Sequence, residues 1–214
     1  MSDDRGARQL ERLTFFSDAV FAIAITLLVI EIHVPEVTQT DTQAYLHALR
    51  ELVPHIFGFA LSFMVIGALW ASHHRVFGML RGHDSDLVWP NLLLLLCVAF
   101  MPFATAFMAE HPAARVPAMF YAGSLLLAGL AQRWLFAKAL LPQRVHQEVA
   151  PQEIVAARWR SFALPALALL AGLLALIAPP YSYLVFGLIP LLARLLAMLG
   201  RRHYVVSTSA PAVE

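Results

Sequence analysis

The chain has 214 residues, of which 60% are hydrophobic and only 14% are charged, and its net charge at neutral pH is +1. This composition is too apolar for an ordinary soluble domain and predicts an all-α integral membrane protein. A net charge this small gives no reason to expect nucleic acid as a partner, and the single cysteine, Cys97, excludes a disulfide within the chain.

Six apolar segments each approach the ~20 residues that a helix needs to cross a hydrocarbon core of ~30 Å. They are residues 14–34, 54–73, 88–109, 116–138, 161–178 and 181–199. Pro102 predicts a kink in the third segment, at residues 98–102. The turn at Pro179-Pro180 predicts that the last two segments form an antiparallel hairpin.

The domain organisation expected from these segments is a single unit. Residues 12–203 form one domain of six transmembrane helices, flanked by polar tails at residues 1–11 and 204–214. Of the 15 Lys and Arg residues, all but Arg50 and Arg115 fall on one side of the predicted spans. Because positive charge concentrates on the cytoplasmic side, both tails are expected to be cytoplasmic.

The first apolar segment combines a carboxylate with an apolar stripe. At about 100° per residue, one narrow face of the helix carries a set of mostly apolar side chains. They are Phe16, Ile23, Thr26, Leu27 and Ile30. Asp18 is about 140° from Ile23 and Ser17 about 120° from it in the other direction, so this polar pair faces away from the stripe. Two interpretations stay open: the stripe packs in the bundle core, or it has a function of its own.

Several polar residues are expected at the same depth as Ser17 and Asp18. They are Arg12 on the first helix, His73 and His74 at the end of the second, and Asn91 at the start of the third. A carboxylate among such groups can be satisfied as a network. The His-His pair is a poor metal site, because neighbours on a helix point about 100° apart and no Cys or second carboxylate stands at ligand spacing. The sequence therefore predicts no metal and no cofactor.

Enzyme motifs are missing from the sequence. There is no G-x-S-x-G, no H-E-x-x-H and no Walker loop, so we expect no enzymatic activity. A re-entrant filter loop like that of the familiar potassium channels is missing too. Mid-span proline is expected to break the third helix alone, which counts against a transporter with broken helices in matching halves.

The first helix resembles a known signature. Arg12-x-x-x-Phe16-Ser17-Asp18, followed by Ala-Val-Phe-Ala-Ile-Ala-Ile-Thr, is similar to the motif of the transmembrane protein 175 family of potassium channels. The resemblance extends to Trp70-x-x-His73-His74 and covers about residues 8–200.

The resemblance implies a homotetramer in a bacterial inner membrane, with a pore lined by the first helix of each subunit. It places the main constriction at Ile23 and further layers at Thr26, Leu27 and Ile30. It assigns the charged motif, with Phe16, to holding the helix against its neighbours through His73, His74 and Asn91. A hydrophobic ring makes an ion shed water, which favours potassium over sodium.

Other readings stay open. Glu31 is expected at the outer mouth, where it either concentrates cations or is simply a solvated carboxylate. A proton path through the same pore, using Asp18, Glu31 or His73, is the first rival. A small secondary transporter and a non-conducting scaffold are the others. Residue spacing does not decide whether Thr26 or Leu27 faces the pore axis.

Overall fold

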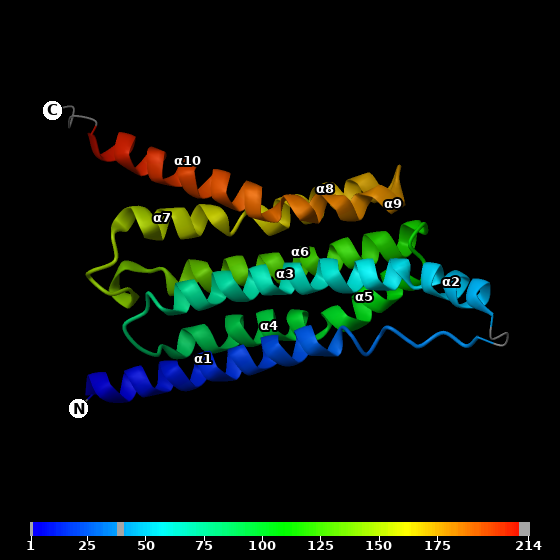
Figure 1. Ribbon diagram of the computed structural model, residues 1–214. Helices are drawn as coiled ribbons and strands as arrows, with labels where there is room; N and C mark the ends of the chain where they lie inside the picture. Colours follow the sequence, from blue (N-terminus) through cyan, green and yellow to red (C-terminus); the bar gives the residue numbers. More distant parts are fainter. Residues whose placement is uncertain (1, 38–40, 210–214) are drawn as a thin grey trace.

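The computed structural model describes residues 2–37 and 41–209, and these form helices joined by short connections (Figure 1). The α-helices are α1 (Ser2–Leu27), α2 (Thr42–Glu51), α3 (Val53–Phe77), α4 (Val88–Ala99), α5 (Met101–Glu110), α6 (Arg115–Ala139), α7 (Pro151–Arg160), α8 (Ala163–Ala175), α9 (Pro179–Ser182) and α10 (Ile189–Ser209). Three 3₁₀ turns, η1 (Ser85–Leu87), η2 (Pro142–Arg144) and η3 (Tyr183–Leu188), complete the described secondary structure. The all-α prediction is therefore confirmed.

The prediction of six transmembrane helices is wrong. Among the described residues, four helical stretches are long and apolar enough to cross a membrane: Thr42–Phe77, Ser85–Glu110, Pro151–Ala175 and Pro179–Val205. The other two predicted spans correspond to α1 and α6. Helix α1 carries Glu11, Arg12 and Asp18 along its length and ends at Leu27, seven residues before the predicted boundary at residue 34. Helix α6 carries Gln132 and Arg133 in its last third.

Prolines divide three of the helical stretches. Pro102 has no N–H to donate to residue 98, and the helix is interrupted at Phe100, between α4 and α5, as predicted. Pro165 follows the break between α7 and α8 in the same way, and Pro190 follows the change from η3 to α10. The expectation that only the third helix would be broken is therefore wrong.

The helices pack around α6. Helix α6 contacts α4, α5 and α8, while α1 lies at the edge of the bundle against α3, α4 and α5. Helices α7 and α10 pack on each other at the opposite edge (Figure 1). The core is continuous, and its largest fully buried side chains include Phe21 on α1, Leu94 on α4, and Tyr121 and Phe136 on α6.

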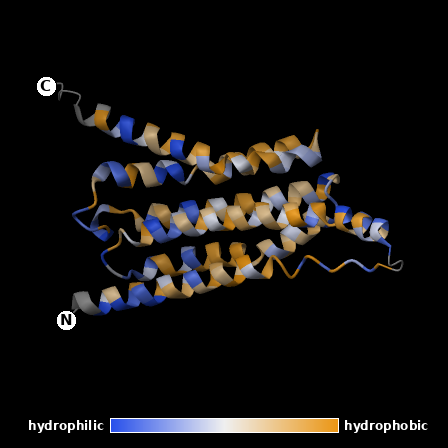
Figure 2. Ribbon diagram, viewed as in Figure 1, coloured by the Kyte–Doolittle hydropathy of each residue, from blue (hydrophilic) through white to orange (hydrophobic). Residues whose placement is uncertain are grey.

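Both described ends of the chain lie at the same end of the bundle (Figure 1). Hydrophilic residues gather there on α1, whereas the other half of α1 is apolar (Figure 2). The segments predicted as tails are mostly helical, because α1 begins at Ser2 and α10 continues to Ser209; residues 1 and 210–214 lie outside the described residues. The cytoplasmic location of this end stays a prediction from charge alone.

Candidate functional site

Helix α1 has two distinct faces. The residues that face the bundle are spaced three, four or seven apart, which is the pattern of one helix side. They are Leu10, Ser17, Phe21 and Ala24, and Leu28 directly after the helix continues the row; each is at most 9% exposed. The apolar stripe lies on the outer side, where Phe16 is 51% exposed and Ile23 is 58% exposed. The stripe therefore does not pack in the core of its own chain, which removes one of the two interpretations left open by the sequence.

The far end of the stripe is not helical. Helix α1 ends at Leu27 and the chain continues as a turn, closed by a 3.1 Å hydrogen bond from the Ile30 N–H to the Leu27 carbonyl. Ile30 is 65% exposed, but its direction follows from this turn and not from helical spacing.

Thr26 and Leu27 are both exposed at the end of α1. The Thr26 hydroxyl donates within its own helix, toward the carbonyl oxygens of Ile23 at 2.9 Å and Ala22 at 3.0 Å. Leu27 is 41% exposed. Each is accessible from outside the chain, so rotation of the helix still decides which of them would face an axis.

A buried hydrogen-bonded chain fastens the other face of α1. The Asn91 Nδ2 donates to Ser17 Oγ at 2.9 Å, and Ser17 Oγ donates to the Leu13 carbonyl at 2.8 Å. Asn91 Oδ1 lies 2.9 Å from His73 Nε2 and can only accept, so that nitrogen carries a proton. Ser17, His73 and Asn91 are all 0% exposed. The structure thus joins α1, α3 and α4 through three residues that the sequence had grouped together.

His73 is held by rings as well as by Asn91. Phe77 stacks on it with ring centroids 3.9 Å apart, and Phe21 of α1 lies 5.6 Å away. Its Nδ1 is buried without a hydrogen-bond partner among the described residues. This matches a neutral imidazole, whose single N–H is at Nε2 and donates to Asn91.

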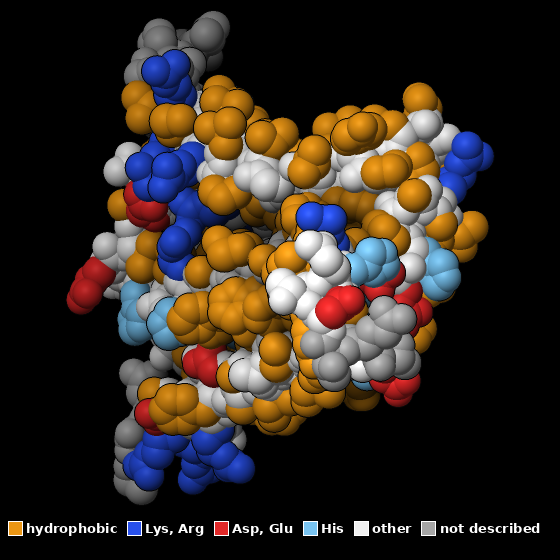
Figure 3. All heavy atoms as spheres, turned by 45° about the vertical axis from the view of Figure 1, so that its right-hand side comes forward, with side chains coloured by type: hydrophobic (Ala, Val, Ile, Leu, Met, Phe, Trp, Pro, Cys, Tyr) orange, Lys and Arg blue, Asp and Glu red, His pale blue; other side chains and the backbone are white. Residues whose placement is uncertain are grey.

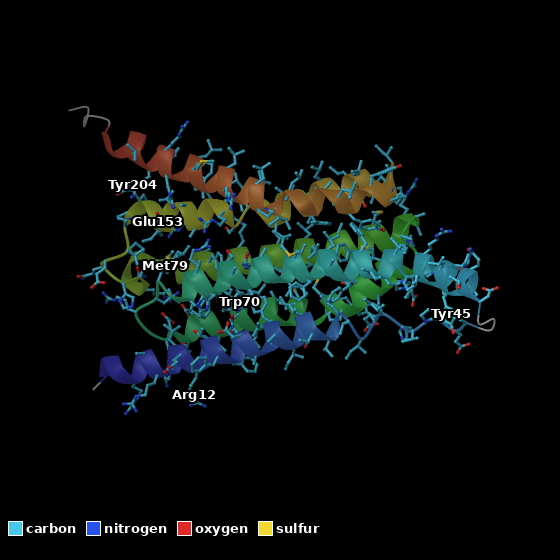
Figure 4. The ribbon with its side chains drawn as sticks, in the orientation of Figure 1. Arg12, Tyr45, Trp70, Met79, Glu153 and Tyr204 are labelled. Atoms are coloured by element: carbon cyan, nitrogen blue, oxygen red, sulfur yellow. The ribbon has the colours of Figure 1, made fainter. Side chains whose placement is uncertain are left out.

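Asp18 has a different partner from those expected. Trp70 Nε1 donates to Asp18 Oδ1 at 2.8 Å, joining α3 to α1, and Trp70 lies between the two helices in Figure 4. His74 is exposed and its ring lies 5.5 Å from that of Trp70. Arg12 is exposed on the outer side of α1 and forms no ion pair with another described residue (Figure 4). Trp70 belongs to the Trp70-x-x-His73-His74 motif near the end of the second predicted span. Its indole N–H is a hydrogen-bond donor, so the sequence did contain a signal for this partner of Asp18.

Glu31 lies in the turn that follows α1 and is half-buried. His33 Nδ1 lies 3.2 Å from its carbonyl oxygen, which is a contact of the backbone and not of the carboxylate. The carboxylate is thus in no ion pair with another described residue, and both readings of Glu31 stay predictions.

A second buried polar group lies deeper in the bundle. Thr105 Oγ1 donates to Ser62 Oγ at 2.7 Å, and Ser62 Oγ lies 2.9 Å from the Tyr121 hydroxyl. These residues belong to α5, α3 and α6, and each is at most 3% exposed. They were not anticipated, because isolated Ser, Thr and Tyr residues on different helices show no pattern in sequence. Their hydrogen bonds tie the three helices together at a depth where polar groups need partners.

Comparison with known proteins adds to this geometry. The family model described as "Endosomal/lysosomal potassium channel TMEM175" matches residues 12–102, the range that holds both the apolar stripe and the Ser17–Asn91–His73 chain. A protein of Chamaesiphon minutus named as a potassium channel is 40% identical over 147 residues, which is 67% of this chain and 72% of that protein. The human protein named endosomal/lysosomal proton channel TMEM175 is 23% identical over 196 residues, and the chain spans only 38% of it.

A solved structure agrees in fold. The crystal structure described as a lysosomal potassium-selective channel TMEM175 homolog from Chamaesiphon minutus superposes with a TM-score of 0.73. That protein is 35% identical, and the match covers 90% of this chain and 98% of the other. With the motif residues in place on α1 and α3, the chain belongs to the TMEM175 family of membrane channels.

Proposed function

We propose that this protein is a potassium-preferring cation channel of a bacterial cell membrane, in which four copies surround a pore lined by α1. The observation that carries the proposal is the exposed stripe of α1 through Phe16, Ile23 and Leu27. Relatives named as potassium channels in bacteria support the ion and the setting.

The stripe is arranged as a shared surface would be. One face of α1 is fixed to α3 and α4 by buried side chains, while the opposite face carries large apolar groups that are left exposed. One helix cannot enclose a path by itself. Four copies related by a symmetry axis would bring the same face of each α1 together. A helix that lines a pore faces lipid on few of its sides. The charged residues in the first half of α1 are therefore compatible with a pore-lining position.

The chemistry of the stripe suggests how the pore would act. A ring of Ile23 side chains offers no oxygen ligands, so it can close by dewetting and makes a passing ion lose water. Potassium holds its water less tightly than sodium, and the barrier is therefore lower for potassium. We expect modest selectivity, since no fixed cage of carbonyl groups replaces the hydration shell. The Thr26 hydroxyl is the polar side chain nearest this ring along the chain, and Glu31 is the first carboxylate that follows it.

Ion flux into vesicles tests the proposal. The purified protein in liposomes should carry potassium down its gradient at equal pH on both sides. Ile23→Asn should wet the ring and lower the preference for potassium over sodium. Leu169→Asn is the matched control, because Leu169 is also exposed, at 54%, but lies on α8. Unchanged selectivity in Ile23→Asn would remove Ile23 from the constriction.

The same assay separates the rivals. Flux that appears only with a pH gradient would indicate a proton path, as the name of the human relative suggests. The geometry favours it less, because His73 is enclosed and Asp18 is bonded to Trp70. Transporters bind their substrates at broken helices, and this chain has helix breaks at Phe100 and Ser161. Saturable flux at a fixed stoichiometry would identify a transporter. No flux of any ion would indicate a scaffold.

A further inference from the structure

Two adjoining cavities lie on the side of α3 that faces α10, away from the α1 stripe. The first, of about 190 Å³, is bounded by α3, α6, α10 and the α7–α8 junction. The second, of about 460 Å³, is bounded by α3, η3 and the start of α10. They share Val65 and Ala68 on α3 and Ile189 and Pro190 on α10. Together they form one groove, here called the α3–α10 groove.

The groove is long and mostly apolar. Its α3 wall runs from Phe57 to Arg75, which at 1.5 Å per residue is about 27 Å, close to the ~30 Å thickness of a hydrocarbon core. The larger cavity is lined almost wholly by apolar side chains, among them Phe63, Met64 and Phe186. Its size is within the range of about 300–1,000 Å³ that is typical of ligand sites.

One end of the groove is cationic. Arg75 at the end of α3 and Arg160 at the end of α7 both line the smaller cavity, with Ser72 and Gln132 beside them. Neither arginine forms an ion pair with another described residue. Most Lys and Arg residues lie at this end of the molecule, and Figure 3 shows Lys and Arg side chains gathered along its left edge beside a broad apolar surface. Other charged and histidine side chains lie on the right half of that view. The groove therefore joins an unneutralised positive end to an apolar length.

Two glycines keep the apolar part open. Gly67 on α3 and Gly187 on η3 both line the larger cavity, and a Cβ added at either would meet no atom within 4 Å. The space beside them is thus left empty by the protein itself. In a bilayer such a space takes up the chains of neighbouring lipids.

We propose that the α3–α10 groove binds an anionic phospholipid, with its phosphate at Arg75 and Arg160 and an acyl chain along the apolar length past Gly67. Charge complementarity selects an anionic headgroup, because a zwitterionic one would add its own positive charge beside the two arginines. Basic pockets between membrane helices bind anionic headgroups in this way. The site is separate from the α1 stripe, so it stands or falls independently of ion conduction.

Native mass spectrometry of the full-length protein tests the headgroup end. After exchange into mixed micelles, the protein should retain phosphatidylglycerol in preference to phosphatidylcholine. Each of Arg75→Gln and Arg160→Gln should weaken retention of phosphatidylglycerol about fivefold. Arg202→Gln is the control, since Arg202 is exposed on α10 and lines neither cavity. Equal retention of the two lipids, or equal retention by all the variants, would overturn the proposal.

A second pair of variants tests the acyl-chain end without touching charge. Gly67→Leu should fill the groove and lower retention, whereas Gly123→Leu on α6 should not, because Gly123 also has free space but lines neither cavity. Size-exclusion chromatography of both variants checks that they are folded. If Gly67→Leu instead changed the oligomeric state and left lipid retention intact, the groove would be a contact between copies, and the lipid site would be refuted. Displacement of the lipid by inorganic phosphate alone would likewise refute the role of the acyl chain.

Discussion

Asn91 is the residue on which the fixed face of α1 depends most. Its amide donates to Ser17 and accepts from His73, and all three side chains are fully buried. Asn91→Ala would leave the buried His73 N–H without a partner, at a cost of about 1–3 kcal/mol. It would also remove the donor to Ser17 Oγ, which would keep only its bond to the Leu13 carbonyl. We expect a clear drop in the thermal unfolding temperature of the detergent-solubilised protein. Ser124→Ala is the control, since that exposed hydroxyl bonds only to the Phe120 carbonyl of its own helix; an equal drop in both variants would contradict this role for Asn91.

Asp18 acts in the structure as an acceptor for Trp70. Asp18→Asn keeps a carbonyl oxygen that can accept from the indole N–H, while Asp18→Ala removes it. We therefore expect Asp18→Ala to reduce the yield of assembled protein and Asp18→Asn to keep most of it, as measured by size-exclusion chromatography. If Asp18→Asn lost as much as Asp18→Ala, the negative charge and not the hydrogen bond would be the essential feature.

Single residues were predictable where helical geometry alone decided their direction. The angle between Ser17 and Ile23 on a helix was enough to place them on different faces, and the structure has Ser17 buried and Ile23 exposed. Which of the two faces is the buried one was left open by spacing alone. The partner of Asp18 was not predictable in this way. Whether Trp70, Arg12 or His74 reaches the carboxylate depends on how α3 is rotated and tilted against α1, and spacing along one helix carries no such information.

At the scale of elements, α6 and α8 approach closely through a glycine. A Cβ on Gly129 would lie 2.8 Å from Cδ of Pro165 and 3.1 Å from its backbone nitrogen, so the ring and backbone would have to move. We expect Gly129→Ala to destabilise the fold by about 1–3 kcal/mol, although alanine favours helix. The measurement is thermal unfolding in detergent.

The same helix supplies the control for that prediction. Gly123 has no atom within 4 Å of an added Cβ, so Gly123→Ala should be neutral or slightly stabilising. Destabilisation of both variants to the same extent would mean that the α6–α8 contact is not what requires a glycine.

Helix boundaries show what hydropathy can and cannot predict. The break near Pro102 was predictable because the proline interrupts a long apolar run, and the helix does stop there. The end of α1 at Leu27 was not, because residues 28–34 are as apolar as the helix before them and hydropathy does not distinguish a turn from a helix. The case of α6 is different: it is one continuous helix over the predicted span, but it is not among the four helical stretches of the described residues that meet the criteria of length and composition.

At the scale of the whole molecule, the α1 stripe is the feature that one chain leaves unexplained. Most large apolar residues outside the core can face lipid, but the stripe lies on a helix whose charged residues make it poorly suited to lipid on all sides. In the proposed channel, the partner of that surface is another copy of the chain. No spacing rule within one chain can reveal that contact.

Cross-linking through the stripe provides the direct measurement of assembly. In a Cys97→Ala background, Ile23→Cys should place one thiol of every copy around the common axis, so a short bis-maleimide should produce covalent dimers within the membrane. Leu169→Cys on α8 is the matched control: its side chain is equally exposed, at 54% against 58%, but it lies on a different helix, away from the stripe. We expect the Ile23→Cys protein to cross-link efficiently at low protein-to-lipid ratio and the Leu169→Cys protein to remain monomeric on a denaturing gel. Similar cross-linking of both would reflect random collision, and the absence of cross-linking at residue 23 would show that the stripe does not face other copies of α1.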